Sequence, residues 1–300
     1  MTSAVPRRFQ LDNPYLLAAL ASLCWSSNHI VGRAAAGHVP PFWISTMRWL
    51  LPAVVVWLFA RKVILRDWPA IRTHWRAMLL ISLTGGTLFT VLQYVSLQYT
   101  TALNLSVLNS LVPVFIAVVA AALFADYLIP RQIAGLAVSL AGVLVVISHG
   151  DPDVLTSLQF NKGDLLVVVS MMVSAVYSVS LRLRPPMHWL SLLFVMALVS
   201  AVTTLPLAVW EAASGYVPRF DLLTVFITLF VGIVPGFLAT VAWNRSVEVI
   251  GSNRAGPFMH LVPLYSAGLA SVFLGERLGV FHVVGLALIL TGVWLASRKA

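Results

Sequence analysis

A 33-residue segment occurs twice in this chain. Residues 111–143 return as residues 261–293 at a constant offset of 150 without a gap, and 12 of the 33 aligned positions are identical. Pro113 coincides with Pro263, and an acid coincides with an acid. Chance similarity between two apolar segments would repeat leucine, valine and alanine, but would not so readily repeat proline and an acid in register. The chain is therefore predicted to hold two copies of one unit of about 150 residues.

Composition decides the solvent of such a chain. Hydrophobic residues make up 60% of it and charged residues 10%, whereas a soluble domain has about 25% charged residues. Too few polar groups are present to cover a surface in water. Lipid is therefore the expected solvent, and helices that satisfy their own backbone hydrogen bonds are the expected elements. A single cysteine, Cys24, excludes a disulfide or a cysteine metal site within the chain.

Apolar segments of bilayer length define the predicted helices. A bilayer core of about 30 Å needs about 20 apolar residues per helix. Ten segments fit, namely 14–34, 41–60, 76–98, 102–124, 130–148, 164–183, 188–210, 221–244, 254–274 and 279–297. The polar linker 149–163 separates a first five-helix repeat, 14–148, from a second, 164–297, with tails at 1–13 and 298–300. The sequence predicts an all-α integral membrane protein with ten transmembrane helices.

Basic residues set the predicted orientation. With the N-terminus in the cytoplasm, 14 of the 19 Lys and Arg residues fall on the cytoplasmic side, which is the pattern of the positive-inside rule. Both termini are therefore expected inside, and the formal net charge of +9 does not indicate nucleic-acid binding. Because each copy has an odd number of helices, the second copy must be inverted relative to the first. Inverted repeats around a central, midplane cavity are typical of secondary transporters.

Several short motifs resemble those of a known family. They are Trp25-Ser26-Ser27-Asn28, Met47-Arg48-Trp49-Leu50-Leu51-Pro52-Ala53, Leu111-Val112-Pro113, Leu274-Gly275-Glu276-Arg277-Leu278 and the glycine-flanked stretch 285–293. With them the chain resembles the drug/metabolite transporter superfamily, in its EamA-type branch of ten-helix carriers. The resemblance implies a bacterial-type inner membrane and export of amino acids or of aromatic cationic drugs. Ala125-Asp126-Tyr127 departs from the Gly-Glu-Arg pattern in the first copy.

Carboxylates are expected to avoid the membrane centre. All ten lie in predicted loops or near predicted helix ends, although an acid inside a span normally marks an ion or proton pathway. The coupling mechanism therefore stays open, and uncoupled transport is an option. No metal site and no cofactor are expected. The chain has no HExxH, GxSxG or P-loop motif, so an integral-membrane enzyme and a channel are both disfavoured against a carrier.

Polar and aromatic residues within the predicted helices are the candidate substrate-binding residues. In the first helix Ser22, Trp25, Ser26 and His29 follow the spacing of one helical face. The candidates are Trp25, Asn28, His29, Gln93, Tyr94, Asn109, Ser110, Tyr177, Trp243, Asn244, Met259 and His260. The alternatives are that small and polar residues only join helices, and that Trp25 and Tyr94 are interfacial anchors.

Two prolines and one arginine complete the set. Pro113 and Pro263 each break a helical hydrogen-bond ladder, which predicts symmetric bends beside the polar faces. Arg48 lies about six residues inside the outer end of its predicted helix. It can extend to the headgroups, or it can bind an anion or a helix terminus.

The predicted cavity lining selects a class of substrate. It is polar and aromatic but carries no formal charge, so a sugar phosphate or a divalent metal would find neither basic nor acidic ligands. A small net-neutral solute fits, most simply a free amino acid, and an aromatic cation is the second candidate through cation–π contact. The expected partners are this substrate and the lipid bilayer, while monomer and homodimer both stay open.

Overall fold

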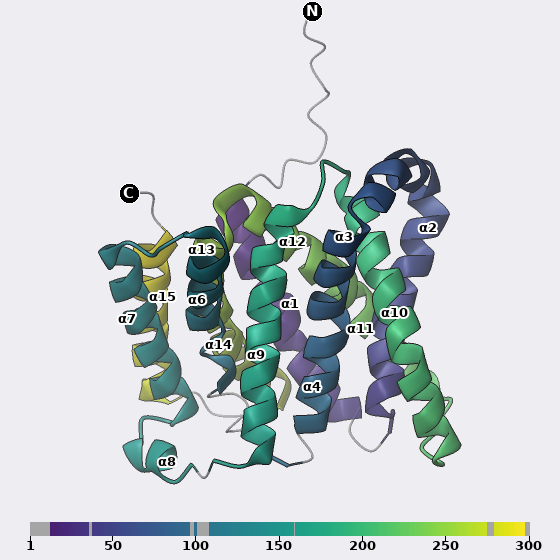
Figure 1. The fold of residues 1–300 in the computed structure, drawn as a ribbon. Helices are drawn as coiled ribbons and strands as arrows, with labels where there is room; N and C mark the ends of the chain where they lie inside the picture. Colours follow the sequence, from purple (N-terminus) through teal and green to yellow (C-terminus); the bar gives the residue numbers. More distant parts are fainter. Residues whose placement is uncertain are drawn as a thin grey trace, which may run out of the picture.

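The computed structural model describes residues 13–35, 38–96, 99–100, 108–158, 160–274 and 279–297, and every regular element in them is a helix (Figure 1). The longer elements are α1 (Pro14–Ala35), α2 (Pro41–Thr73), α3 (Trp75–Ser82), α4 (Phe89–Ser96), α6 (Val112–Phe124), α7 (Pro130–Ile147), α9 (Lys162–Ser180), α10 (Trp189–Ala213), α11 (Leu222–Val231), α12 (Ala239–Ile250), α14 (Leu261–Leu274) and α15 (Val280–Ser297). The shorter ones are η1 (Leu83–Leu88), α8 (Pro152–Thr156), η2 (Leu181–Leu183), η3 (Gly232–Leu238), α13 (Ser252–Ala255) and η4 (Gly256–His260).

Seven helical segments within the described residues are long and apolar enough to cross a membrane. They are Pro41–Thr73, Trp75–Gln93, Pro130–Ile147, Lys162–Leu183, Trp189–Ala213, Leu222–Ile250 and Val280–Ser297. The other three predicted spans coincide with α1, α6 and α14. Both α6 and α14 are short, 13 and 14 residues, because each begins only next to its proline. Residues 102–107 of the fourth predicted span lie outside the described residues.

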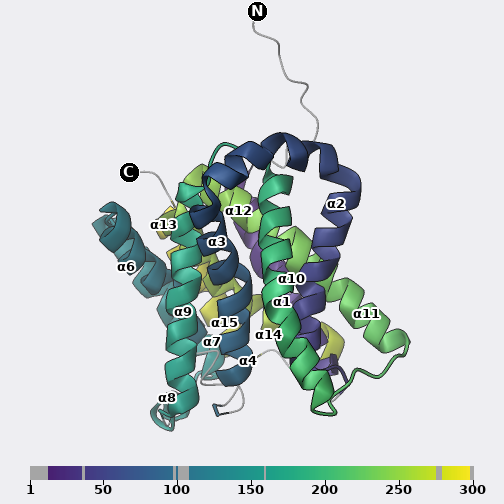
Figure 2. The ribbon, with the colours of Figure 1, turned by 45° about the vertical axis from the view of Figure 1, so that its right-hand side comes forward.

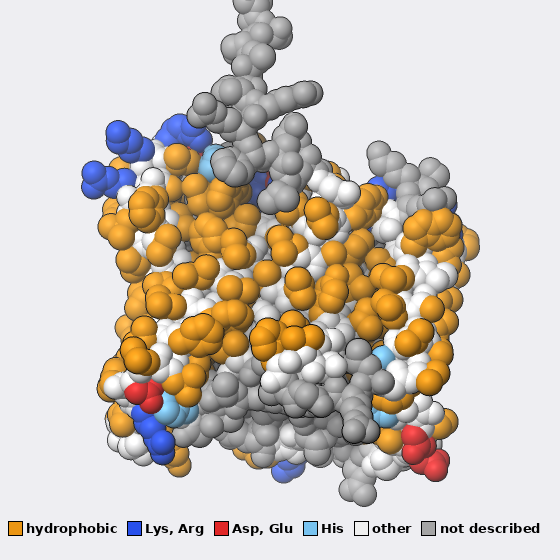
Figure 3. All heavy atoms as spheres, turned by 180° about the vertical axis from the view of Figure 1, so that it is seen from behind, with side chains coloured by type: hydrophobic (Ala, Val, Ile, Leu, Met, Phe, Trp, Pro, Cys, Tyr) orange, Lys and Arg blue, Asp and Glu red, His pale blue; other side chains and the backbone are white. Residues whose placement is uncertain are grey.

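Much of the surface is apolar. Figure 3 shows one face with a broad band of hydrophobic side chains, with charged side chains gathered at the two ends. Large hydrophobic side chains elsewhere in the described residues are also strongly exposed, including Phe59 and Leu222 at 88% each. An apolar surface of this extent needs hydrocarbon rather than water around it.

The second helix is longer than predicted. α2 continues to Thr73, whereas the sequence predicted a membrane span that ends at residue 60. The prediction was wrong because the segment is amphipathic: Ile64, Asp67 and Ile71 are buried at helical spacing while its basic side chains face outward. In Figure 2 this part of α2 bends over the end of the molecule before α3 begins.

Helices that are equivalent in the two copies pack on each other. α7 packs along α15, and α2 packs along α10. The first helix of each copy packs on helices of the other copy. α1 packs on α12 and α14, and α9 packs on α4 and α6. Adding about 150 to the residue numbers of α4 and α6 gives those of α12 and α14. The contacts of α9 therefore correspond to the contacts of α1.

Glycines bring α7 and α15 into backbone contact. A Cβ on Gly135 would lie 2.6 Å from the carbonyl oxygen of Gly292, and one on Gly142 would lie 2.9 Å from that of Gly285. An early position of α7 thus meets a late position of α15, and the reverse holds for the other pair. The two helices therefore run antiparallel, and any side chain at these positions would force them apart.

Two π-helical segments occupy equivalent positions of the copies. η1 and η3 interrupt the third helix of each copy, and they coincide after a shift of 150 residues. Such segments are rare and are frequently found at functional sites. A Cβ on Gly85 of η1 would lie 2.5 Å from the Tyr177 ring, so the wide turn brings the backbone against an aromatic side chain.

Candidate functional site

An aromatic and polar cluster joins α1, α9 and α12. The rings of Trp25 and Trp243 lie 5.5 Å apart at an angle of 56°. The Tyr177 hydroxyl donates a hydrogen bond to Asn244 Oδ1, and Asn244 Nδ2 lies 3.7 Å from the sulfur of Met196. Trp243 is only 1% exposed and Tyr177 is 7% exposed. The structure therefore brings together four of the predicted site residues and buries Tyr177 and Trp243 among them.

Arg48 adds a positive charge to this cluster. Its Cγ packs against the backbone of η3, because a Cβ on Gly236 would lie 3.4 Å from it. The guanidinium lies 5.7 Å from the Trp49 ring, and η3 leads directly into α12, which carries Trp243 and Asn244. The half-buried side chain thus faces the protein. The sequence reasoning expected an uncharged site because helix packing, which decides the direction of Arg48, cannot be read from the chain.

A second polar cluster joins two other candidates, Gln93 and Asn109, to Ser170. Gln93 Nε2 on α4 donates to Asn109 Oδ1 at 3.0 Å and to Ser170 Oγ on α9 at 2.8 Å. Asn109 Nδ2 lies 3.5 Å from Gln93 Oε1 in return. Both amides are half-buried. Ser170 was not among the predicted site residues, although it shares a helix with Tyr177 at helical spacing of two turns.

His260 is held inside the protein. It is fully buried, with Nε2 2.8 Å from the Ser110 carbonyl oxygen and Nδ1 2.7 Å from Ser139 Oγ. Because a carbonyl only accepts, Nε2 carries the proton and the Ser139 hydroxyl donates to Nδ1. Both ring nitrogens and the Ser110 carbonyl are therefore engaged in this conformation. Residues 110 and 260 are equivalent positions of the two copies, and they contact each other.

Pro113 and Pro263 start helices here. Pro113 lies in the first turn of α6, and Pro263 lies in the first turn of α14, directly after the 3₁₀ segment η4. A proline at a helix start removes no hydrogen bond that the helix would make. The carbonyls left around the second break are satisfied by α1, since Ser22 donates to the Phe258 carbonyl at 2.8 Å and Ser26 to the Val262 carbonyl at 3.2 Å.

The remaining candidate residues are Asn28, His29, Tyr94 and Met259. Asn28 and Met259 are half-buried. The side chains of His29 and Tyr94, and residues 275–278 with Glu276, lie outside the part that the structure describes. Within the described part, no group of three His, Cys, Asp or Glu side chains could hold a metal ion.

Two carboxylates at helix ends hold the α2–α10 pair. Asp67 Oδ2, late in α2, accepts from the His188 amide and the Ser191 hydroxyl, both at 2.8 Å, at the start of α10. Glu211 Oε2, late in α10, accepts from the amides of Phe42 and Trp43, both at 3.0 Å, at the start of α2. Each acid thus supplies negative charge to the N-terminus of its partner helix. Both are buried, at 8% and 6% exposure.

Comparisons with known proteins agree with this architecture. The chain matches the EamA-like transporter family over residues 13–148 and 161–298. It is 29% identical to an uncharacterized transporter of Archaeoglobus fulgidus over 95% of this chain and 97% of that protein. It is 23% identical to a probable amino-acid metabolite efflux pump of Salmonella typhimurium, over 93% of each. It is 24% identical to a probable terminal-alkyne amino-acid exporter of Streptantibioticus cattleyicolor, over 72% of this chain and 71% of that protein. A crystal structure with 20% identity superposes with a TM-score of 0.77, covering 95% of this chain and 96% of that chain.

Proposed function

This chain belongs to the EamA-like transporter family, and from that premise we propose that it exports a small zwitterionic metabolite, most simply a free amino acid. The family match confirms the resemblance found in the sequence. It also makes the chain a multi-pass membrane transporter rather than an enzyme. Two relatives are named for amino-acid export, which supports the substrate class without fixing it.

The observation that carries the proposal is the Tyr177–Asn244 pair together with the Trp25–Trp243 rings, with Arg48 packed against η3, the segment that leads into α12. A guanidinium binds a substrate carboxylate through paired, charge-assisted hydrogen bonds. An ammonium group can be met by the neutral oxygens of the pair and by the faces of Trp25 and Trp243, which lie together. One positive charge among neutral and aromatic groups suits a zwitterion better than a cation or a phosphate dianion. The Gln93–Asn109–Ser170 cluster provides further neutral donors and acceptors.

We infer alternating access between two inverted five-helix repeats, 14–148 and 164–297, joined by the linker 149–163 and enclosing a central cavity. The two-part family match, the equivalent π-helical segments and the exchanged contacts of α1 and α9 support this. So does the antiparallel α7–α15 contact, because Gly135 with Gly292 becomes Gly285 with Gly142 when the copies are exchanged. Exchange of the conformations of two such halves moves the site from one side to the other.

The proposed orientation has both termini in the cytoplasm of a bacterial-type inner membrane. It is supported by the basic side chains of α2 and α3 at the end of the molecule that also holds α13 (Figure 1). In a Cys24→Ala background, cysteine at residue 66 should react with an impermeant reagent only from the cytoplasmic side, and cysteine at residue 156 only from the outside. The opposite labelling would reverse the orientation.

Counterflow in proteoliposomes with a panel of labelled amino acids tests the function. Arg48→Gln should lower kcat/KM for the transported amino acid by about tenfold or more, the usual weight of a hydrogen bond to a charged group. Arg219→Gln is the matched control, because Arg219 is exposed in the loop before α11. Flux of sugar phosphates or metal ions without any neutral amino acid would refute the proposal.

An aromatic cation is the second candidate. The close contact of Trp25 with Trp243 favours it, whereas the positive charge of Arg48 opposes it. The same assay decides, because export of a cation should improve in Arg48→Gln, while export of an amino acid should fall.

A further inference from the structure

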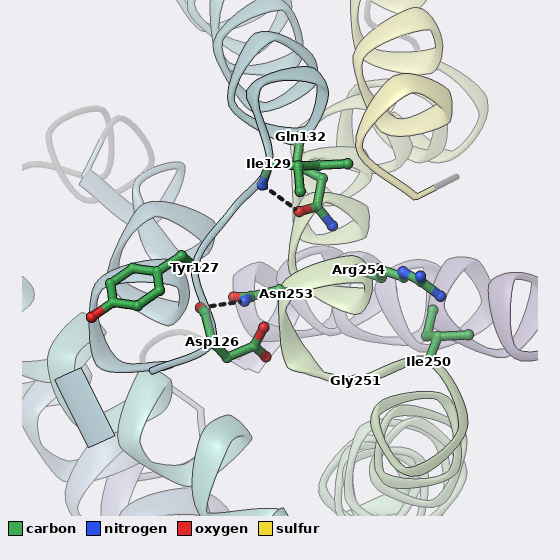
Figure 4. A pocket seen from close by; sticks show the side chains of 8 residues that line it. All are labelled: Asp126, Tyr127, Ile129, Gln132, Ile250, Gly251, Asn253 and Arg254. Carbon is green, nitrogen blue, oxygen red and sulfur yellow. Dashed lines mark hydrogen bonds between the residues drawn. The ribbon is translucent and has the colours of Figure 1, made fainter. Parts of the chain in front are cut away.

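A pocket of about 400 Å³ opens at one end of the molecule, away from the Trp25–Trp243 cluster. Figure 4 shows its two walls. One wall is the connection between α6 and α7 with the first turn of α7, and it carries Asp126 and Gln132. The other is Gly251 with the short helix α13, and it carries Asn253 and Arg254. This is the end that holds α13 and the start of α7 in Figure 1, which is the cytoplasmic end in the proposed orientation.

One hydrogen bond joins the two walls, and local backbone structure shapes each of them. Asn253 Nδ2 donates to the Asp126 carbonyl oxygen at 3.0 Å. Gly251 has φ +80°, a conformation that side chains disfavour, and it turns the chain from α12 toward Asn253. Gln132 Oε1 accepts from the Ile129 amide at 3.0 Å. The pocket is therefore a built feature of two chain turns rather than a gap between mobile side chains.

Arg254 differs from the other arginines at this end. Arg182 pairs with Asp126, Arg184 pairs with Glu248, and Arg245 lies 3.0 Å from the same Glu248. Within the residues that the structure describes, the half-buried side chain of Arg254 makes neither an ion pair nor a hydrogen bond. It lines the pocket together with an acid, and Figure 4 shows the Asp126 carboxylate and the Arg254 guanidinium on separate walls. The pocket thus offers both signs of charge at a distance from each other.

We propose that this pocket is a reception site that binds a zwitterionic amino acid before it reaches the central site. Arg254 binds the carboxylate, and the Asp126 oxygen that is not used by Arg182 accepts from the ammonium group. Ile129 and Ile250, which also line the pocket, contact the side chain of the ligand. The inference rests on the proposed amino-acid export and adds a second, sided recognition step to it.

Sided transport measures this step. In inside-out membrane vesicles the pocket faces the medium, whereas in right-side-out vesicles it faces the lumen. Arg254→Gln should raise the KM for uptake into inside-out vesicles by about tenfold, the weight of one hydrogen bond to a charged group, while the maximal rate stays within about twofold. Arg254→Lys should restore part of the loss, because it keeps the charge but not the paired geometry.

Two controls separate this step from folding and from the central site. Arg245→Gln removes a neighbouring guanidinium that pairs outside the pocket and should leave the KM unchanged. The decarboxylated amine of the same amino acid, used as an inhibitor from the pocket side, should lose no potency in Arg254→Gln. If the wild-type protein moves the amino acid but Arg254→Gln shows an unchanged KM, or the same change from both sides, the reception site is refuted and the export function stands. If the wild-type protein moves no amino acid, both fail.

Discussion

Two helix pairs relate the copies of this chain, and they are built in opposite ways. α7 and α15 touch through the backbones of Gly135, Gly142, Gly285 and Gly292. α2 and α10 touch through bulky side chains, with Trp49 against Ala197 and Ala201, and with the Trp57 ring 5.4 Å from Phe194; a carboxylate holds each end. Backbone contacts of this closeness admit one arrangement only. Side-chain stacks and hydrogen-bonded ends can be broken and remade as discrete contacts. We therefore expect α7–α15 to be the fixed joint and α2–α10 the moving one.

The largest effect is expected from one methyl group in the fixed joint. In Gly292→Ala the new Cβ would lie 2.4 Å from the Ser139 backbone nitrogen and 2.5 Å from the Gly135 carbonyl oxygen. Backbone atoms cannot yield as a side chain can, so the helices must separate, at a cost near the upper end of the range of about 1–3 kcal/mol for overpacking. Thermal unfolding in detergent, followed by size-exclusion chromatography, measures the loss. Gly268→Ala on α14 is the control, because no atom within 4 Å meets its Cβ; equal losses in both variants would remove the argument.

A reversible link across the moving joint comes next. Thr46 Oγ1 on α2 and Thr204 Oγ1 on α10 lie 3.1 Å apart, a separation from which two introduced cysteines can form a disulfide. In a Cys24→Ala background, oxidation of the Thr46→Cys, Thr204→Cys protein should stop counterflow, and a reducing agent should restore it. Each single-cysteine variant should keep its flux under oxidation. Full transport by a protein shown to be cross-linked would mean that α2 and α10 do not move apart.

A smaller loss of folding free energy is expected when Glu211, at the buried end of the α2–α10 pair, is replaced. Glu211→Ala leaves the amides of Phe42 and Trp43 without their acceptor, which costs about 1–3 kcal/mol of folding free energy. Glu211→Gln keeps an acceptor and loses only the charge at the helix N-terminus, for about 1 kcal/mol. Glu248→Gln is the control, since that carboxylate is 34% exposed and surface pairs contribute little. If Glu211→Gln is as damaging as Glu211→Ala, the charge rather than the hydrogen bonds holds α2.

The smallest effect is expected at an exposed acid that also caps a helix. A hydrogen bond with His38 and the amide of Thr224 at the start of α11 lower the pKa of Asp221 to about 2. Since the folded pKa is below the ordinary value, this contribution is complete above about pH 4 and is lost as the pH falls through about 2. Thermal unfolding of wild type and Asp221→Asn should differ slightly at pH 5 and converge toward pH 2. A difference that grows with acidity would contradict the assignment.

The sequence alone predicted the family and most helix positions, because motifs and hydropathy depend only on residue order. The division into two inverted repeats stays a prediction. The predictions from sequence were incomplete where contacts between helices decide the local structure. Residues 61–73 have the charge of a loop, yet they form one helix with α2 because three of their side chains find a buried surface. The π-helical turn η1 exists together with the close approach of Gly85 to Tyr177, a partner more than 90 residues away.

The candidate site was predicted in the same uneven way. Polar spacing identified Trp25, Tyr177, Trp243 and Asn244, which do meet. Spacing along one helix could not reveal that Arg48 on α2 packs against η3, the segment that leads into α12. It also could not reveal that the ring of His260 is already occupied by Ser110 and Ser139. These facts depend on contacts between helices that are distant in the chain.

The contact between His260 and the Ser110 carbonyl also limits how alike the two halves of the chain are. Only one of the two equivalent positions carries an imidazole, and the other offers its backbone oxygen. A serine at position 260 would have no ring nitrogen to place on this carbonyl. The two halves are therefore not interchangeable at this contact.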